Sequence, residues 1–544
     1  MSRGVILAEI QKMMIWKGME SPELDKNSGP KNKKKSVSLL RSGLLVSICT
    51  LLSRVLGLVR DAALAFVLGA SGSADAFYVA FKIPNFFRRL FAEGAFAQAF
   101  VPVLSDYKVN HGHQAVRELI SAVSGSLGLI LLLVSAVFMA FSPWVVYLFA
   151  PGFADNATQL ALASDLLTIT FPYLMFISLT ALAGGILNSH DEYAVPAITP
   201  IFLNLSLIVA TVFFANDALQ KETAIAWGVF AAGALQLAFQ LPFLARLNLL
   251  PMPSLGFSHP GVKRIFKLML PALFGVSVGQ INLLLDTILA SFLQTGSITW
   301  LYLSDRLYEL PLGIFAIAIS TVILPSLSRS FAGEESSRFT STLDWGLRTV
   351  LLIAIPSSLA LYLLAEPLIA TIFYRGELTV HDVSMAAMSL QAYSLGLVFM
   401  MLIKVLAPAY YARQDTKTPV KIGIVAMVAN MAFNLMLVGP FGHVGLAIAT
   451  TLSAALNAFL LWRGLRARSL HSFGGVWLRS CFAILLGVLC LGGLLWWQSS
   501  LGLVWTQLSD FERVWRIALL VCAGLVVYLI GLVLGGFRPR MLKV

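Results

Sequence analysis

The sequence predicts an all-α polytopic membrane protein with about 14 transmembrane helices. Hydrophobic residues make up 58% of the 544 residues, charged residues make up only 12%, and the mean hydropathy is +0.82. Ordinary globular proteins contain roughly 45–50% apolar and about 25% charged residues. A soluble core could not bury this much apolar surface, so most of it must face lipid. The composition excludes a cytosolic enzyme, a secreted domain and a disordered regulator.

Apolar stretches long enough to cross a bilayer begin near Leu39 and recur almost to the C-terminus. Each crossing needs about 20 residues, and the loops between the stretches are short. The predicted crossings are 39–67, 75–103, 118–149, 159–188, 195–215, 223–246, 264–293, 299–327, 345–373, 383–411, 420–438, 443–462, 475–497 and 512–535.

Lysine and arginine residues gather in alternate loops. By the positive-inside rule these loops stay in the cytoplasm together with both termini, as an even number of crossings requires. The net charge of +12 therefore sets the topology. It does not indicate a nucleic-acid partner, because no basic domain studded with aromatic residues accompanies it. The residues on this side include Lys31, Lys108, Arg117, Arg246, Lys263, Arg264, Arg329, Arg338, Arg413, Lys417, Arg463, Arg466, Arg468, Arg538, Arg540 and Lys543.

Both ends of the chain are expected to be tails. Residues 1–36 are polar and contain no apolar segment followed by a cleavage site, so they predict a disordered cytoplasmic tail and not a signal peptide. Residues 538–544 predict a second cytoplasmic tail. All four cysteines lie inside apolar runs, which favours core packing over disulfides or a thiolate metal site. They are Cys49, Cys481, Cys490 and Cys522.

The two halves of the sequence resemble each other. Asp61–Ser73 is similar to Asp286–Ser297, and Phe100–Ser105 is similar to Ile323–Ser328. Between these segments, a proline of the first half falls opposite a proline of the second, Pro84 opposite Pro311. Because the copies are six crossings apart, they have the same orientation. Some transporters show such parallel repeats, with the substrate path between the halves.

This repeat predicts the domain organisation. We expect an N-terminal lobe of six helices, a C-terminal lobe of six helices, and a helix pair outside the repeat. The predicted boundaries are 39–247 for the N-lobe, 258–464 for the C-lobe and 474–537 for the pair.

Three predicted helices carry charged residues in their middles. A charge at the bilayer centre costs about 2.5–3.5 kcal/mol on insertion scales, so such side chains must face protein or water. On the second helix Asp75, Lys82 and Arg89 are seven residues apart and share one stripe. The set is expected to line a water-filled cavity between the lobes. Its members are Arg54, Arg60, Asp61, Asp75, Lys82, Arg88, Arg89, Glu93, Asp305, Arg306 and Glu309.

The predicted cavity favours an anionic substrate. Six of these charged residues are basic and five are acidic, and most of the basic ones are arginine. A guanidinium group keeps its charge and presents a planar fork of donors that suits phosphate. Pairing within the set is the alternative, in which Asp61 beside an arginine would hold helices together. No ATP-binding module is recognisable, so an ion gradient or the membrane potential would drive transport.

Four segments carry a more specific resemblance, namely Ser53–Asp61, Pro84–Pro102, Asp305–Glu309 and Lys404–Pro419. They resemble the signatures of the MurJ (MviN) family of lipid II flippases, in order and in spacing, within a match from about Leu39 to the C-terminus. The resemblance implies the multidrug/oligosaccharidyl-lipid/polysaccharide exporter superfamily, two six-helix lobes, and a C-terminal pair that forms a lipid-exposed groove. It also implies a transporter, not an enzyme, that moves lipid II to the outer leaflet of the inner membrane by alternating access. The expected partners are membrane lipids and lipid II, a disaccharide-peptide linked to undecaprenyl pyrophosphate, and we expect a monomer.

The resemblance also implies roles for single residues. Four arginines correspond to cavity residues needed for function, Asp75 to a required acid and Glu309 to a polar cavity position. Lipid II carries a pyrophosphate between its sugar head and its polyprenyl tail, and arginines could hold it while the tail stays in lipid. Thr299 stands where some relatives have serine. The predicted substrate-binding set is Arg54, Arg60, Arg88, Arg306, Asp75, Glu309, Arg89, Lys82 and Thr299.

A sodium site is predicted in the second half. Asp286 lies mid-helix, where an unpaired carboxylate is expensive. Carboxylate, amide, hydroxyl and carbonyl oxygens suit a hard monovalent cation, and some members of the family appear to hold sodium between the corresponding helices. Other relatives have asparagine at the Asp286 position, so a protonated or proton-coupling Asp286 stays open. The predicted ligands are Asp286, Asn430, Asn434, Leu446 and Thr450, and no other cofactor is expected.

Two other functions stay open at this level. One is an ion-coupled exporter of drugs or of another polyprenyl-linked glycan, although cationic drugs would meet a cation-rich cavity. The other is a membrane glycosyltransferase, which would need carboxylates on a sizeable loop outside the membrane. Depletion of a flippase would leave lipid II on the cytoplasmic leaflet, whereas depletion of the enzyme would stop its synthesis.

Overall fold

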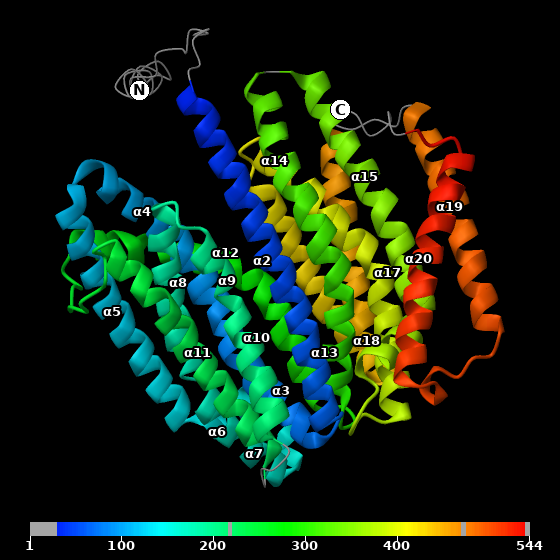
Figure 1. The fold of residues 1–544 in the computed structure, drawn as a ribbon, viewed down its shortest axis with the longest axis horizontal. Helices are drawn as coiled ribbons and strands as arrows, with labels where there is room; N and C mark the ends of the chain where they lie inside the picture. The colour runs from blue at the N-terminus through cyan, green and yellow to red at the C-terminus, as the bar shows by residue number, and fades with distance from the viewer. Residues whose placement is uncertain (1–29, 216–219, 334, 469–474, 539–544) are drawn as a thin grey trace.

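The computed structural model describes residues 30–215, 220–333, 335–468 and 475–538, and throughout this part of the chain the regular elements are helices (Figure 1). Ten of these helices are long and apolar enough to cross a membrane. This confirms an all-α polytopic membrane protein. The total of 14 crossings stays a prediction.

The first half of the chain forms a bundle on one side of the molecule. Its elements are α2 (Pro30–Leu68), α3 (Gly72–Phe87), the π-helix η1 (Arg88–Phe96), α4 (Ala97–Asn110), α5 (Gly112–Ala140), α6 (Ser142–Phe149), α7 (Ala157–Thr170), α8 (Tyr173–Ser189), α9 (Ala194–Ile198), α10 (Pro200–Val209) and α11 (Lys221–Arg246). We call this bundle the N-lobe.

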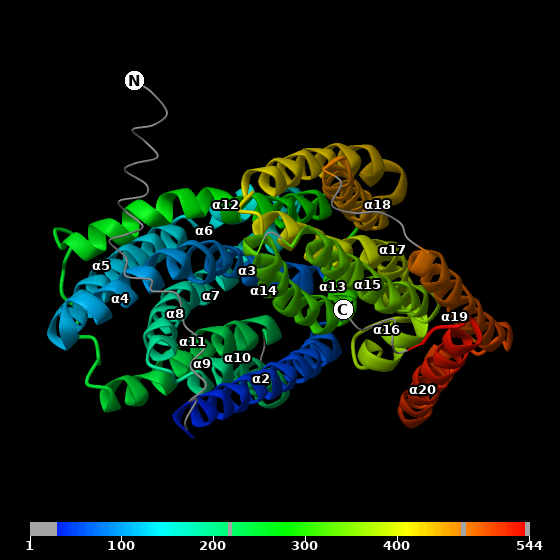
Figure 2. The same cartoon turned by 90° about the horizontal axis from the view of Figure 1, so that it is seen from above.

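The second half forms the C-lobe and a helix pair at its outer side (Figure 2). The elements of the C-lobe are α12 (Pro260–Ser291), α13 (Ser297–Pro311), the π-helix η4 (Leu312–Ala316), α14 (Ile317–Ala332), α15 (Ser336–Leu363), α16 (Ala365–Phe373), α17 (Val380–Tyr411) and α18 (Lys417–Ala467). The pair is α19 (Gly475–Ser500) and α20 (Asp510–Leu534), with α19 packed on α15 and α20 on α16.

Local sequence sets several helix boundaries. Ser71 begins α3 by accepting a hydrogen bond from the Ala74 amide, and Thr379 begins α17 in a reciprocal capping box with Asp382. The 51 residues of α18 cover two predicted crossings, because Gly442 breaks the helix with φ 55° and ψ −133°. Only glycine adopts such a backbone conformation readily.

The two tails lie mostly outside the described residues, which exclude 1–29 and 539–544. One difference is visible at the edge of the first tail. α2 begins at Pro30, so residues 30–36 are helical and do not belong to a disordered segment. Lysine is a good helix former, and proline is tolerated in the first turn of a helix.

The internal repeat is visible in the irregular parts of the helices. In the N-lobe, α3 contains Pro84 and runs into the π-helix η1, and in the C-lobe α13 contains Pro311 and runs into the π-helix η4. Proline cannot donate the regular helical hydrogen bond, and single π-turns are common where the helical ladder is disturbed. The same irregularity therefore recurs at matching places in the two lobes.

Helix α12 does not belong to one lobe alone. It packs on α18 of the C-lobe, but also on α4 and η1 of the N-lobe. The connection that precedes it is docked on α5, where the Ser254 amide donates to the Ser121 carbonyl at 3.1 Å and the Gly256 amide donates to the Ser126 hydroxyl at 3.1 Å. The predicted lobe boundary at residue 258 therefore divides the sequence, but the helix that follows it packs against both lobes.

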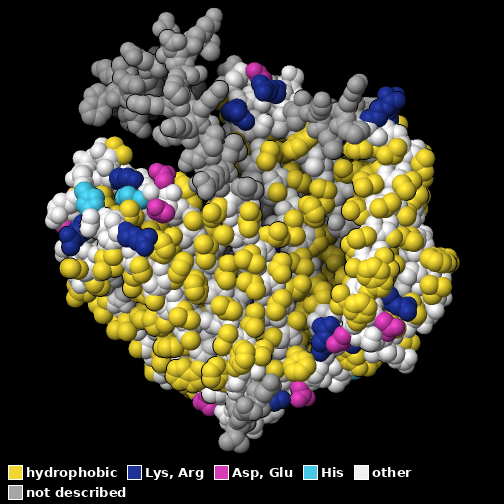
Figure 3. Space-filling view, viewed as in Figure 1, with side chains coloured by type: hydrophobic (Ala, Val, Ile, Leu, Met, Phe, Trp, Pro, Cys, Tyr) yellow, Lys and Arg dark blue, Asp and Glu magenta, His cyan; other side chains and the backbone are white. Residues whose placement is uncertain are grey.

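The surface agrees with a membrane location. Hydrophobic side chains cover a broad middle belt, and charged side chains gather near its two ends (Figure 3). Large apolar residues such as Leu133, Trp496 and Leu525 are more than half exposed on this belt. Lipid, not water, is the solvent that makes such exposure favourable.

Candidate functional site

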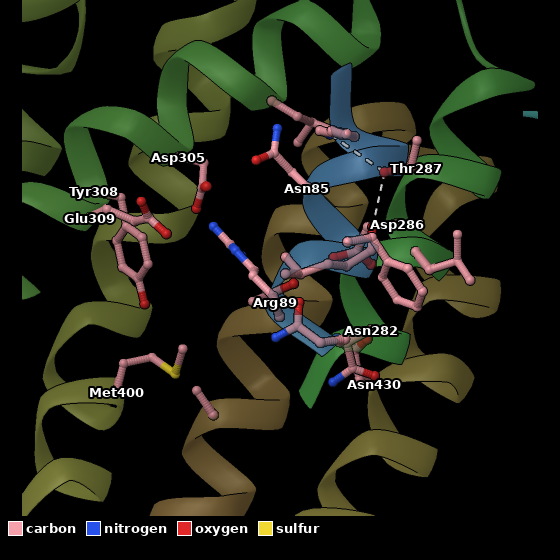
Figure 4. A pocket seen from close by; sticks show the side chains of 18 of the residues that line it. Asn85, Arg89, Asn282, Asp286, Thr287, Asp305, Tyr308, Glu309, Met400 and Asn430 are labelled. Carbon is pink, nitrogen blue, oxygen red and sulfur yellow. Dashed lines mark hydrogen bonds between the residues drawn. The ribbon is translucent and has the colours of Figure 1, made fainter. Parts of the chain in front are cut away.

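A cavity of about 830 Å³ lies between the lobes. Its walls come from α2, α3 and η1 on the N-lobe side and from α12, α13, α17 and α18 on the other side (Figure 4). The cavity extends toward the end of the molecule where α2 begins, because Tyr411 at the end of α17 and Pro419 in the first turn of α18 both line it. It is large enough to take a bulky polar group.

Most of the predicted substrate-binding residues line this cavity or its neighbour. Arg60, Lys82, Arg88, Arg89, Arg306 and Glu309 line the main cavity. Arg54 lines an adjoining cavity of about 200 Å³, which it shares with Arg60, Arg306 and Glu309. The structure thus brings together side chains from three helices that are far apart in the sequence. The side chain of Glu93 lies outside the described residues.

A buried ion-pair network beside the cavity joins α2 of the N-lobe to α13 of the C-lobe. Asp61 accepts hydrogen bonds from Arg60 of its own helix at 2.7 and 2.9 Å and from the Tyr302 hydroxyl of α13 at 2.9 Å. Arg306 lies 3.5 Å from the other oxygen of Asp61, and its guanidinium group stacks over the Tyr302 ring at 4.7 Å. Asp61 is 1% exposed. Its pairing with arginine, expected as one possible role of these charges, is confirmed.

Two arginines share the buried acid of this network, and one of them reaches a second acid. One carboxylate, Asp61, is shared by the guanidinium groups of Arg60 and Arg306. Arg60 is further held by the Asn204 amide oxygen at 3.0 Å, and Arg306 reaches Glu309 at 3.3 Å. Two guanidinium groups around one buried acid are therefore fixed in place, with donor capacity left for an anion.

Arg54 is positioned by a close approach to the other lobe. A Cβ atom added to Gly313 of η4 would lie 2.1 Å from a guanidinium nitrogen of Arg54. A side chain at this position would therefore displace the flexible end of Arg54 from its place across η4. This contact sets Arg54 at the opening between α2 and the C-lobe.

The remaining cations project from α3 and η1. Lys82 lies 3.5 Å from the Thr287 hydroxyl, and the Arg88 guanidinium donates to the Asn85 side-chain oxygen at 3.1 Å. Arg89 extends across the cavity toward Asp305 and Glu309 (Figure 4), and it makes no ion pair with a described residue. All three cations line the cavity.

Asp75 and Thr299 bond to each other and do not line the cavity. Asp75 accepts from the Gly296 amide at 2.7 Å, from the Thr299 amide at 2.9 Å and from the Thr299 hydroxyl at 2.7 Å. Asp75 is 2% exposed and Thr299 is fully buried. The expectation that both face the cavity is therefore not met, because Asp75 faces the first turn of α13, whose free amides and hydroxyl attract a carboxylate.

A second contact closes the same end of the molecule. The Glu377 amide donates to the Phe66 carbonyl at 3.0 Å, and the Glu377 carboxylate pairs with Lys221 at 3.1 Å. Gly376, with φ +63°, allows this approach, since a Cβ atom there would lie 2.1 Å from the Phe66 oxygen. Both contacts join the N-lobe to the C-lobe. We call this end, where α2 ends and α3 begins, the outer end.

The predicted sodium ligands lie in two groups. The Asn434 amide donates to Asp286 at 2.8 Å and to Asn430 at 3.2 Å, while Thr450 donates to the Leu446 carbonyl at 3.1 Å. The Asn434 side-chain oxygen is buried without a hydrogen-bond partner. An orphaned buried oxygen beside a carboxylate fits a cation, because such a group normally has a partner. The described residues contain no group of three or more His, Cys, Asp or Glu side chains that could hold a metal.

Sequence reasoning missed two residues of the site. Tyr302 lies one turn before Arg306, and this spacing could have placed it beside the arginine. Lys404 also lines the cavity, as does Asp305, which was predicted to do so. The charge of Lys404 was visible, but its position on α17 relative to the cavity depends on packing between helices.

A family model for the lipid II flippase MurJ matches residues 64–515. The chain belongs to this family. It is similar to a probable lipid II flippase MurJ of Vibrio cholerae, with 48% identity over 93% of this chain and 98% of the relative. A probable lipid II flippase MurJ of Haemophilus influenzae is 47% identical over 91% of this chain and 99% of the relative.

Solved structures of the same fold agree with the family. A lipid II flippase MurJ in an inward closed conformation aligns with a TM-score of 0.77 and 28% identity, over 90% of this chain and 98% of that one. An inward-facing multidrug transporter of the MATE family aligns with a TM-score of 0.64 and 14% identity, over 79% of this chain and 98% of that one. The second likeness shows a shared fold only.

Proposed function

We propose that this protein flips lipid II from the cytoplasmic to the outer leaflet of the inner membrane by alternating access, and so supplies cell-wall synthesis. The observation that carries this proposal is the wall of cations between the lobes, formed by Arg60, Lys82, Arg88 and Arg89. Membership of the MurJ family supports the choice of substrate. The protein acts as a transporter, without chemical change to the lipid.

The pyrophosphate of lipid II is the group that the cations hold. Arg60 and Arg306 are already fixed around Asp61, so their free donors require little ordering when an anion arrives. A guanidinium group can donate two parallel hydrogen bonds to one phosphate. Arg54, at the opening beside α2, would meet the pyrophosphate first, while the polyprenyl tail stays in lipid.

The conformation of this structure suits loading from the cytoplasm. The outer end is closed by Asp75 with Thr299 and by Phe66 with Glu377, whereas the cavity extends toward the opposite end. The positive-inside rule assigns that opposite end, together with both termini, to the cytoplasm. Release to the other leaflet would then require the two contacts at the outer end to break as the lobes rock.

Sodium is proposed as a coupling ion. Asp286, Asn430 and Asn434 would hold it together with Thr450 and the Leu446 carbonyl, and the bound ion would supply a positive charge that neutralises Asp286. The orphaned Asn434 oxygen supports this choice. The test is flipping in vesicles with sodium replaced by potassium or choline at fixed pH and potential. A rate indifferent to sodium, together with an active Asp286→Asn variant, would leave the membrane potential as the drive.

We propose that the protein acts as a monomer in the inner membrane. The cavity, both closing contacts and the predicted sodium ligands all come from one chain. An exporter of cationic drugs is disfavoured, because such a drug would meet the cations of the N-lobe wall.

Depletion in cells tests the proposed function. Loss of the protein should leave lipid II on the cytoplasmic leaflet while its synthesis continues, and wild-type protein should restore its appearance outside. Failure of lipid II to form would instead indicate an enzyme. Unchanged exposure of lipid II on the outer leaflet would contradict the proposal.

A further inference from the structure

The two walls of the main cavity differ in charge. The charged side chains on the N-lobe wall are Arg60, Lys82, Arg88 and Arg89, which gives a formal charge of +4. The C-lobe wall carries the acids Asp286, Asp305 and Glu309 and the cations Arg306 and Lys404, which gives a formal charge of −1. A purely anionic ligand would be attracted by the cations of the N-lobe wall and repelled by the acids of the C-lobe wall.

Two carboxylates form a distinct acidic patch on the C-lobe wall. Asp305 and Glu309 are one turn apart on α13, so they project from the same face of the helix. Asp305 makes no hydrogen bond or ion pair with a described residue, and Glu309 reaches only one edge of Arg306, at 3.3 Å. In Figure 4 both side chains point into the cavity, opposite Arg89. Their acceptor oxygens are thus open to a ligand.

Aromatic rings complete the patch. Tyr308 and Tyr393 both line the cavity, and their rings stack with centroids 5.5 Å apart. Tyr308 is 4% exposed, and its hydroxyl makes no hydrogen bond with a described residue although it points into the cavity (Figure 4). Carboxylates beside aromatic faces are the combination that binds an ammonium group, through charge and through cation–π attraction.

We propose that Asp305 and Glu309, with the Tyr308 and Tyr393 rings, bind a primary ammonium group on the substrate's peptide, while the N-lobe wall binds its phosphates. This proposal rests on the proposed function and adds a second recognition point to it. A head group that carries both charges would span the cavity from wall to wall. A lipid pyrophosphate without a peptide amine would satisfy only the N-lobe wall, so the patch makes the cavity selective for the complete precursor.

Two rival roles compete for the same carboxylates. They could pair with Arg89 when the lobes move closer, or they could carry protons for coupling. In either case a neutral substitution of these carboxylates would change the affinity for every ligand by the same factor. Recognition of an ammonium group predicts instead a loss confined to ligands that carry one, and this difference makes the roles separable.

The test compares two forms of lipid II on the full-length protein in lipid nanodiscs. One form has a free lysine ε-amine on its peptide, and in the other this amine is acetylated, so that the positive charge is lost and the pyrophosphate is unchanged. Wild-type protein should bind the free-amine form about tenfold more tightly, equivalent to about 1.4 kcal/mol. Equal affinities for the two forms would overturn the proposal without any variant.

Substitutions in the patch test which residues produce the preference for the free-amine form. Asp305→Asn and Glu309→Gln should each reduce the ratio of the two affinities, and the double variant should bring this ratio to within about twofold. Tyr308→Phe should keep most of the preference and Tyr308→Leu should lower it. The matched control is Glu118→Gln, an exposed acid of α5 far from the cavity lining, which should change nothing.

The outcomes separate this proposal from the proposed function. The ammonium site is overturned if the Asp305/Glu309 double variant still prefers the free-amine form. It is also overturned if the double variant loses the same affinity for both forms of lipid II. Arg88→Ala should weaken both forms equally. If wild-type protein binds neither form above the level of Arg88→Ala, the proposed function itself fails.

Discussion

Asp75 on the N-lobe accepts two hydrogen bonds from Thr299 on the C-lobe, one from its amide and one from its hydroxyl. Neither residue lines the cavity, and their contact joins the two lobes at the outer end. Hydrogen bonds to a charged group contribute about 1.5–3 kcal/mol each. Breaking this contact is therefore a substantial part of opening the outer end.

The first prediction concerns this contact. Asp75→Asn should weaken closure, since an amide has one acceptor oxygen and no charge, and the outer end should open in a larger fraction of molecules. Thr299→Ser should preserve the contact. Thr299→Val loses the hydroxyl bond, so its fraction of open molecules should lie between those of Thr299→Ser and Asp75→Asn. Labelling of Ser297→Cys by an impermeant reagent measures this, because the Ser297 side chain is 1% exposed while the outer end is closed. Equal labelling in all three variants would contradict a closing role.

The second prediction concerns the anion-binding arginines. Replacement of Arg54, Arg60, Arg88 or Arg306 by alanine should abolish growth of a flippase-depleted strain while the protein stays in the membrane. Lysine should rescue only in part, because its single ammonium group cannot donate the paired bonds of a guanidinium group. Growth assays with immunodetection of each variant provide the measurement. Normal growth with every alanine variant would remove the arginines from the mechanism.

A third prediction uses two glycines with the same backbone conformation. Gly376 has φ +63° and Gly502 has φ +66°, but a Cβ atom on Gly376 would lie 2.1 Å from Phe66, whereas nothing lies within 4 Å of one on Gly502. Alanine costs about 1–2 kcal/mol in this conformation at either site. Only Gly376→Ala should also push Glu377 away from α2 and open the outer end. Cysteine labelling at that end, compared between the two alanine variants, distinguishes the clash from the strain.

The fourth prediction concerns movement of the lobes. A Cβ atom on Gly72 would lie 3.6 Å from the Thr295 Cγ2 atom, so the two positions are neighbours across the outer end. Gly72→Cys with Thr295→Cys, in a background without the four native cysteines, should crosslink on oxidation and stop flipping until reduced. A pair within the N-lobe, Gly184→Cys with Pro196→Cys, has a similar separation of 3.5 Å and should crosslink without loss of flipping. Undiminished flipping by the first pair would argue against rocking.

Much of the fold was predictable because the bilayer restricts the chain to apolar helices of known length. The cavity residues were predictable for the same reason, since Arg60 and Arg89 are too costly to face lipid. The partner of Asp75 was not predictable, because its contact depends on the first turn of α13 and on how two lobes meet. The bridging position of α12 was also hidden, because the few polar residues in its sequence do not reveal which lobe each face of the helix contacts.

Transfer of lipid II across a bilayer tests the central claim most directly. Purified protein would be reconstituted into vesicles with labelled lipid II in one leaflet, and its appearance in the other would be followed with an impermeant quencher. Wild-type protein should accelerate transfer well above empty vesicles, and Arg88→Ala should return the rate to that of empty vesicles. Equal transfer by wild-type protein and by Arg88→Ala, or none above empty vesicles, would contradict flipping through the cation-lined cavity.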